Sequence, residues 1–235
     1  MTRILAIETS TELATAAILT DGGIFIRELS GVQTHSQGIL PAIQALLAEA
    51  GVRLQDCDAI AFGCGPGAFT GIRTACGIVQ GLAYGADLPV VPVVSLLAMA
   101  EAAREQVTSN EFVCILDARM NEVYWAQYRF EDTGWTEVSA PALTGLDAAL
   151  AAMTLESTQL VLGNGLTLPE PAQTRYPGLL CMPHAKQVGM LGRNDFAAGH
   201  GLPAEQAQPL YLRNKIALTT AEREQVKLQA AKAPA

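Results

Sequence analysis

The chain has 235 residues, a formal net charge of −8 and a 50% hydrophobic composition, which excludes a disordered protein and allows one large domain or two small ones. Its few Lys and Arg residues are scattered. This argues against direct nucleic-acid binding, because neutralisation of phosphates drives that affinity. No apolar run is long enough to cross a bilayer, and MTRILAIETS at the N-terminus turns polar too soon for a signal peptide. We therefore expect a cytoplasmic protein that does not enter a membrane.

The first fifty residues predict three strands and one helix. The strands are expected at 3–8, 14–19 and 24–29, and Asp21-Gly22-Gly23 is a typical hairpin turn between the last two. The next segment, GILPAIQALLAEAG, carries apolar residues at helical spacing along one side: Ile39, Leu40, Ile43, Leu46, Leu47 and Ala50. We place Pro41 in the first turn of this helix and Gly51 at its end.

A glycine-rich loop, GCGPGAFTG, follows a short apolar strand at 59–62 and leads into a helix that is expected to run to Tyr84. Residues 89–94 predict a short buried strand. Ser95 is a plausible N-terminal cap for a further helix that ends near Arg104.

After a polar stretch at 106–110 the layout of the chain begins again. FVCILDARMNEVYWAQYRF repeats RILAIETSTELATAAILT: an apolar strand, an acid at its end (Glu8, then Asp117), a polar turn and a second strand. Later, TQLVLGNG echoes DAIAFGCG. The shared order predicts two similar α/β lobes, residues 1–107 and 108–235. The charged end, residues 219–235, is expected to be a frayed helix or tail.

The glycine-rich loop allows three interpretations. It matches the dinucleotide fingerprint G-x-G-x-x-A, but that fingerprint follows the first strand of its unit, whereas here three strands and a helix come first. We set it aside. A turn that faces a phosphate or ribose suits backbone N–H groups at a helix start. Alternatively, the glycines only permit tight packing. The last two interpretations stay open.

The helix after the loop has an unusual second side. Opposite its apolar arc, this helix carries Thr70, Thr74, Gly77 and Gly81, where a solvent face would normally carry Glu and Lys. The first helix has a similarly short, uncharged side, with Gln37, Pro41 and Gln44. Such faces could pack against each other within the chain, or they could dock another protein.

The five cysteines and three histidines form no recognisable metal or disulfide pattern. No C-x-x-C pair occurs, and the cysteines are best explained as small buried hydrophobes. Only Cys64, inside the glycine-rich loop, is a candidate functional thiol. The histidines, His35, His184 and His200, are far apart in sequence, which favours surface or packing roles. We expect no bound metal and no cofactor.

Four segments together carry a family resemblance. ILAIETST, HSQGILPAI, GPGAFTGIRTACGIVQGLA and PLYLR, the last at 209–213, resemble the TsaB (YeaZ) family over nearly the whole chain. The resemblance implies an α/β, actin-like and heat-shock-chaperone-like ATPase fold with two duplicated lobes. It also implies a paired paralogue, TsaD, which transfers a threonylcarbamoyl group to the adenosine beside the anticodon of tRNAs, and an ATPase, TsaE, that joins the pair.

The chain departs from TsaD where chemistry needs specific residues. TsaD has two metal-binding histidines, four residues apart, where this chain has Ser95 and Met99. The glycines of the second-lobe phosphate loop are missing at residues 116–121. The residues that could still lie near a nucleotide are Glu8, Thr9, Ser10, Gly65, Gly67 and Arg119. Arg119, which belongs to the second lobe, could instead be a residue of a solvated turn.

The preferred hypothesis is therefore a non-catalytic scaffold and activator of TsaD, which docks through Gln37, Pro41, Gln44, Thr70, Thr74, Gly77 and Gly81. Transfer RNA would be reached only through the complex, and a homodimer through the same helices is possible in isolation. The alternative is a weak ATPase of the actin-like superfamily, in which Glu8 and Asp117 position Mg²⁺ and water. A metallopeptidase is disfavoured by the missing histidine pair.

Overall fold

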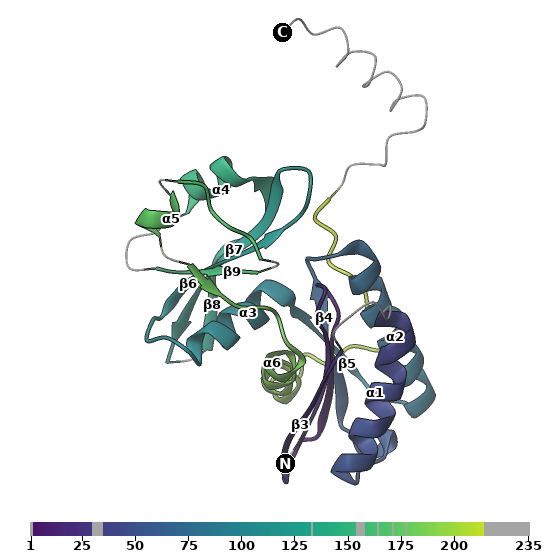
Figure 1. Cartoon of the computed structure of the whole chain (residues 1–235). Helices are drawn as coiled ribbons and strands as arrows, with labels where there is room; N and C mark the ends of the chain where they lie inside the picture. The colour runs from purple at the N-terminus through teal and green to yellow at the C-terminus, as the bar shows by residue number, and fades with distance from the viewer. Residues whose placement is uncertain are drawn as a thin grey trace, which may run out of the picture.

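The computed structural model describes residues 2–29, 35–132, 134–153, 158–163, 165–170, 172–176 and 178–213. These residues form two five-stranded mixed sheets with helices around them (Figure 1). The charged segment 219–235 lies outside the described residues. Among the described helices, none is both long enough and apolar enough to cross a bilayer.

The first sheet has the order β3-β2-β1-β4-β5. Its strands are β1 (Ile4–Glu8), β2 (Ala14–Thr20), β3 (Gly23–Leu29), β4 (Ala59–Gly65) and β5 (Val90–Val94). The strands β1, β2 and β3 pair antiparallel, whereas β4 and β5 continue the sheet in parallel with β1. The three strands predicted before residue 30 are confirmed to within two residues.

The second sheet repeats this order. Its strands run β8-β7-β6-β9-β10, namely β6 (Glu111–Asp117), β7 (Glu122–Glu131), β8 (Gly134–Gly145), β9 (Gln159–Leu162) and β10 (Gly178–Leu180). As in the first sheet, the first two strands pair antiparallel, and the strand β9 joins β6 in parallel. The predicted duplication of an α/β unit is therefore confirmed at the level of topology.

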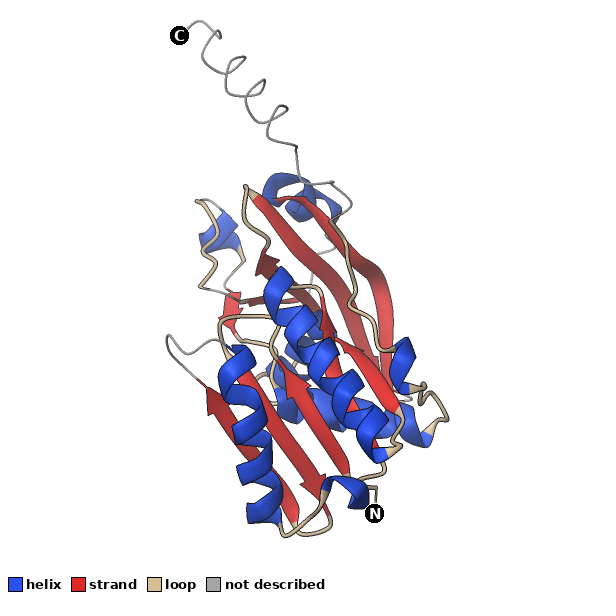
Figure 2. Cartoon of the chain, turned by 90° about the vertical axis from the view of Figure 1, so that its right-hand side faces the viewer, coloured by secondary structure: helices blue, strands red, loops and turns tan. Residues whose placement is uncertain are grey.

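Helices α1 (His35–Ala50) and α2 (Phe69–Ala86) cover one face of the first sheet, and α6 (Ala185–Ala197) covers the other (Figures 1 and 2). Ile39, Ile43 and Leu46 of α1 are buried against β-strand residues such as Ile18, as the helical spacing predicts. Leu40 was expected on this face but is 41% exposed, because it lies at the edge of the apolar arc.

Helix α3 (Ser95–Arg104) joins the two lobes. Its residues Leu96, Met99 and Ala103 pack into the core of the second sheet, while Ala98 belongs to the core under α6. The smaller elements complete the second lobe and the connections: α4 (Leu146–Ala152), α5 (Ala172–Arg175) and the single turns η1 (Leu54–Asp56) and η2 (Ala204–Gln206).

Helix α6 departs from the expected division of the chain. Residues 108–235 were assigned to the second lobe, yet α6 packs on the first sheet. Two glycines allow the approach: a Cβ atom at Gly189 would lie 2.4 Å from a methyl carbon of Leu19, and one at Gly192 would lie 2.4 Å from the Cβ of Ala61. The chain therefore returns to the first lobe near Ala185.

Two local predictions were wrong. Helix α1 already begins by His35, so Pro41 lies inside it rather than in its first turn. Pro41 is on the exposed side, where the loss of one backbone hydrogen bond is tolerated because buried neighbours anchor the helix. Ser95 does not cap α3. Val94 occupies the N-cap position and makes no side-chain cap hydrogen bond, and the Ser95 hydroxyl donates to a buried carboxylate instead.

Candidate functional site

The turn after β1, residues 8–10, lies beneath the glycine-rich loop and is buried by the surrounding chain. Glu8, Thr9 and Ser10 are at most 1% exposed. The Thr9 hydroxyl donates to the carbonyl of Gly71 at 2.8 Å, and the Ser10 carbonyl accepts from the N–H of Ala68 at 2.7 Å. The turn and the loop are thus held together by hydrogen bonds at both ends.

The glycines of the loop are required by this close approach. A Cβ atom at Gly67 would lie 2.3 Å from the Ser10 carbonyl oxygen, and one at Gly71 would lie 1.9 Å from the Thr9 carbonyl oxygen. Gly65 has a φ of +106°, which a side chain would make strained. Of the two interpretations left open, tight packing accounts for Gly67 and Gly71 in this structure. Proximity of a nucleotide to the loop stays a prediction.

Glu8 is a fully buried carboxyl group with two hydrogen-bond donors. Its Oε1 accepts from the N–H of Ser10 at 2.5 Å, and its Oε2 accepts from the Ser95 hydroxyl at 2.8 Å. Burial raises the pKa of Glu8 above its ordinary value of 4.5, and the hydrogen bonds from Ser10 and Ser95 oppose that rise. A Cβ atom at Gly63 would lie 1.9 Å from Oε2, so the strand β4 also closes over the carboxyl group.

The equivalent turn of the second lobe, after β6, is open instead. Arg119, Met120 and Asn121 all have φ near +60°, so three consecutive residues with side chains adopt the left-handed conformation. The guanidinium of Arg119 lies 3.1 Å from the Asp117 carboxylate and is 85% exposed, and Met120 is 77% exposed. Arg119 is therefore solvent-exposed and paired with Asp117, whereas Glu8, Thr9 and Ser10 are buried; proximity of Arg119 to a nucleotide stays a prediction.

Ser95 and Met99, which the family resemblance aligns with the two TsaD histidines, both make contacts inside this chain. The Ser95 hydroxyl is bound to Glu8, and Met99 is fully buried in the core of the second lobe. Within the described ranges, no three His, Cys, Asp or Glu side chains gather in a metal-binding arrangement. Of the candidate histidines, His184 caps α6 through Nδ1, and its Nε2 lies 3.1 Å from Glu28.

The candidate thiol in the loop is buried. Cys64 is 6% exposed, and burial raises its pKa to about 12. A thiol with such a pKa holds its proton at neutral pH and is a poor nucleophile. Of the other cysteines, Cys57, Cys76 and Cys114 are also buried, which agrees with small hydrophobes in the core.

The second side of α2 faces away from the chain's own core. Thr70, Gly77 and Gly81 are exposed, and Thr74 is half-buried. A Cβ atom at Gly77 or Gly81 would meet no atom within 4 Å, so packing against α1 does not explain these glycines. On α1, the residues Gln37, Pro41 and Gln44 are likewise exposed.

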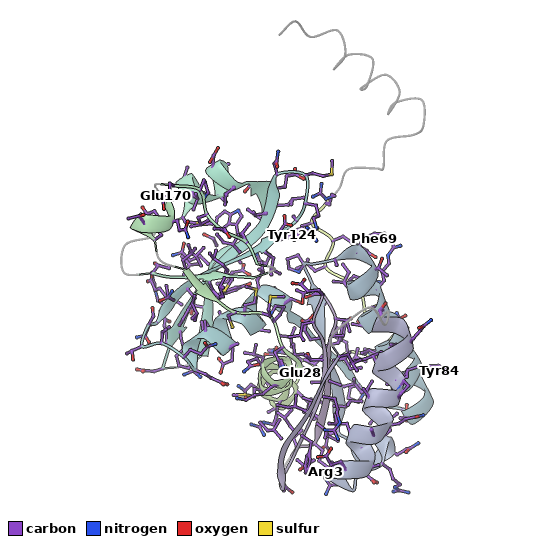
Figure 3. All side chains as sticks on the ribbon, in the orientation of Figure 1. Arg3, Glu28, Phe69, Tyr84, Tyr124 and Glu170 are labelled. Atoms are coloured by element: carbon purple, nitrogen blue, oxygen red, sulfur yellow. The ribbon has the colours of Figure 1, made fainter. Side chains whose placement is uncertain are left out.

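Two exposed aromatic residues of this region were left out of the predicted docking residues. Tyr84, near the end of α2, is 84% exposed and points outward (Figure 3), and Phe69, at its start, is 58% exposed. The guanidinium carbon of Arg73 lies 3.6 Å from the centre of the Phe69 ring, and Arg73 Nε donates to the Tyr211 hydroxyl at 2.5 Å. A large aromatic residue beside a glycine strip was the available signal.

Two α/β lobes with the same strand order and a shared central helix place the protein in the class of actin-like ATPase folds. A family model described as "TsaD: tRNA N6-adenosine threonylcarbamoyltransferase" matches residues 11–199. The chain belongs to this family, within its TsaB (YeaZ) branch.

Similar proteins support that placement. "tRNA threonylcarbamoyladenosine biosynthesis protein TsaB" of Haemophilus influenzae is 37% identical, over 91% of this chain and 94% of its own. The Escherichia coli protein of the same name is 35% identical, over 92% and 96% of the two chains. The structure of YeaZ from Pseudomonas aeruginosa has a TM-score of 0.79 and 36% identity, and covers 90% of this chain and 100% of that one.

Proposed function

We propose that this chain is a non-catalytic scaffold and activator of a TsaD enzyme in the formation of threonylcarbamoyladenosine in tRNA. The names of the two bacterial relatives support a role in this pathway, since both are called tRNA threonylcarbamoyladenosine biosynthesis proteins. The observation that carries the scaffold role is the exposed strip of small residues on α2, whose glycines meet nothing in this chain.

The strip has the properties of a helix-docking surface. Gly77 and Gly81 leave the backbone of α2 accessible, so a partner helix can approach closely. Tyr84 lies beside the strip and supplies a large aromatic contact of the kind that dominates binding energy at interfaces. The uncharged face of α1, with Pro41 and Gln44, extends this surface. A partner with matching helices, such as a paralogue of the same fold, would suit it.

The first-lobe turn supports the absence of catalysis. An ATPase of this fold would use Glu8 to position a metal ion and water. Here Glu8 is sealed between Ser10, Ser95 and Gly63, and Met99 fills the core at the other histidine position. No specific feature of the described residues favours the ATPase alternative.

The acidic charge supports binding of tRNA through the complex rather than by this chain alone. With 15 Lys and Arg against 23 Asp and Glu, the chain has little capacity to neutralise phosphates. We further propose that TsaE joins the assembled pair. A homodimer through the same helices is the arrangement that the isolated chain could form.

The test replaces Gly81 by arginine. Because a Cβ atom there meets nothing within 4 Å, the melting temperature of the isolated Gly81→Arg variant should stay close to that of the unchanged protein. In the complex, an unpaired cation would be buried where two backbones approach, and this would weaken the binding free energy by roughly several kcal/mol. Pull-down of TsaD and tRNA modification in a reconstituted assay should both be lost.

A matched control is Ala151→Arg, which adds the same cation to an exposed position of α4 in the other lobe and should leave pull-down intact. A strongly lowered melting temperature of Gly81→Arg would show that the strip is internal packing. Normal melting with normal pull-down would place the docking surface elsewhere.

A further inference from the structure

The last described residues, 207–213, form a segment that passes from the first lobe to the second. On the first lobe, the N–H of Leu210 donates to the carbonyl of Cys64 at 2.8 Å. The carbonyl of Ala207 accepts hydrogen bonds from the Cys76 thiol and, at 2.8 Å, from the Gln80 side chain. The segment is therefore fixed to the glycine-rich loop and to α2 before it leaves this lobe.

Two residues after Tyr211, the same segment reaches the second lobe. The guanidinium of Arg213 donates to the Ala118 carbonyl at 2.9 Å and lies 2.6 Å from the Glu122 carboxylate. One of its nitrogens also lies 3.6 Å from the Met120 sulfur. Both charged side chains of the ion pair are about three-quarters buried, which strengthens their attraction relative to an exposed pair.

Arg213 thus joins the two residues that flank the left-handed turn 119–121. Non-glycine residues in this conformation are strained, and they persist where the surrounding structure fixes them. The backbone of the turn is supported by hydrogen bonds from the N–H of Ala118 to the carbonyl of Glu122, from the N–H of Glu122 to the carbonyl of Arg119, and from the N–H of Arg119 to the Asp117 carboxylate. Arg213 adds a side-chain bridge between Ala118 and Glu122, which reinforces the direct hydrogen bond between them and ties both ends of the turn to the segment 207–213.

We propose that the segment Pro209–Arg213 is an interlobe clasp, in which Arg213 fixes the turn 119–121 and the position of the second lobe against the first. This role is independent of docking to TsaD. Tyr211 is held on α2 of the first lobe by Arg73. The next two residues of the chain lead from there to the contacts of Arg213 with the second lobe. Release of Arg213 frees the turn and the segment together.

The test is hydrogen–deuterium exchange on the full chain with Arg213→Gln. The amides of residues 118–122 and 207–213 should both exchange faster, by about tenfold, because one charge-assisted anchor serves both segments. The strands β1 and β4 should be unchanged. Glu122→Gln, which removes the same ion pair from the other side, should accelerate the same two segments.

The matched control is Arg129→Gln. Arg129 pairs with Glu111 at 2.6 Å within the second sheet, so its loss removes an ion pair that does not cross between lobes. Neither clasp segment should change. Unchanged exchange in Arg213→Gln, acceleration of only one of the two segments, or uniform acceleration that includes β1 and β4 would each overturn the clasp.

Discussion

The two lobes contain the same turn in two different states. In the first lobe, the turn after β1 is buried beneath the glycine-rich loop, and its acid, Glu8, is sealed from solvent. In the second lobe, the turn after β6 is exposed and left-handed, and its acid, Asp117, pairs with an exposed arginine. The strand order is the same in both sheets, so the difference arises in the loops.

The surroundings of the glycines after the parallel strand differ between the lobes. In the first lobe, Gly67 and Gly71 lack side chains and the loop comes within van der Waals distance of the turn. In the second lobe, Gly163 occupies the place of Gly63, but a Cβ atom there would meet Leu116 and Met99 rather than an acid. The comparison teaches that the same sheet topology can carry one turn that is packed beneath a loop and another that is exposed to solvent.

The largest expected effect is on the buried turn. Gly71→Ala should lower the free energy of unfolding by about 1–3 kcal/mol, because its Cβ atom would lie 1.9 Å from the Thr9 carbonyl oxygen and the backbone must shift. The measurement is denaturant unfolding. Gly77→Ala, in the same helix but with nothing within 4 Å, is the control and should raise stability by about 0.5–1 kcal/mol. Equal effects at the two positions would contradict the tight packing of the first turn.

A smaller effect of opposite sign is expected in the open turn. Met120 has a φ of +58°, and glycine adopts this conformation without a steric penalty. Met120→Gly should therefore raise the free energy of unfolding by about 0.5–1 kcal/mol, after allowance for the greater freedom of glycine in the unfolded chain. Ala151→Gly in α4 is the control and should be destabilising. A loss of stability in Met120→Gly would mean that its side chain, and not the backbone, holds the turn.

The smallest effect is a change in the slope of stability with pH. Because burial raises the pKa of Glu8 above 4.5, the folded protein binds more protons than the unfolded chain just above that pH. The contribution of Glu8 to stability is therefore present below about pH 4.5 and is lost as pH rises through the folded-state pKa. Glu8→Gln should remove this loss, so the variant gains stability relative to the unchanged protein as pH rises. Parallel stability curves across that range would count against a raised pKa.

Much of the fold could be predicted from local patterns. Short apolar runs and a hairpin turn located the first three strands, period-3.6 spacing located the buried side of α1, and the repeated order of elements predicted two similar lobes. The predicted helix start was wrong where contacts between residues distant in sequence intervened. Ser95 had the right chemistry for a helix cap, but the buried Glu8 carboxylate, 87 residues away in sequence, competes for its hydroxyl.

The candidate sites were predicted less completely. Spacing alone placed Thr70, Gly77 and Gly81 on one side of α2, and the structure finds that side exposed. The same reasoning could not decide whether Gly67 and Gly71 faced a ligand or the protein, since a glycine permits either. It also gave no role to the motif PLYLR, because Arg213 acts on Ala118 and Glu122, which only the folded chain brings near.

The sequence by itself determined the two similar α/β lobes and the helix sides, because these follow from the order and spacing of apolar residues; the actin-like class of the fold came from the family resemblance. Tertiary structure decided which polar groups are used within the chain. Glu8 accepts hydrogen bonds from Ser10 and Ser95. Helix α6 packs on the first sheet because Gly189 and Gly192 allow a close approach, and Arg213 bridges the lobes. The physical reason is that hydrogen bonds and close approaches depend on positions in space, whereas amphipathic spacing is written along the chain.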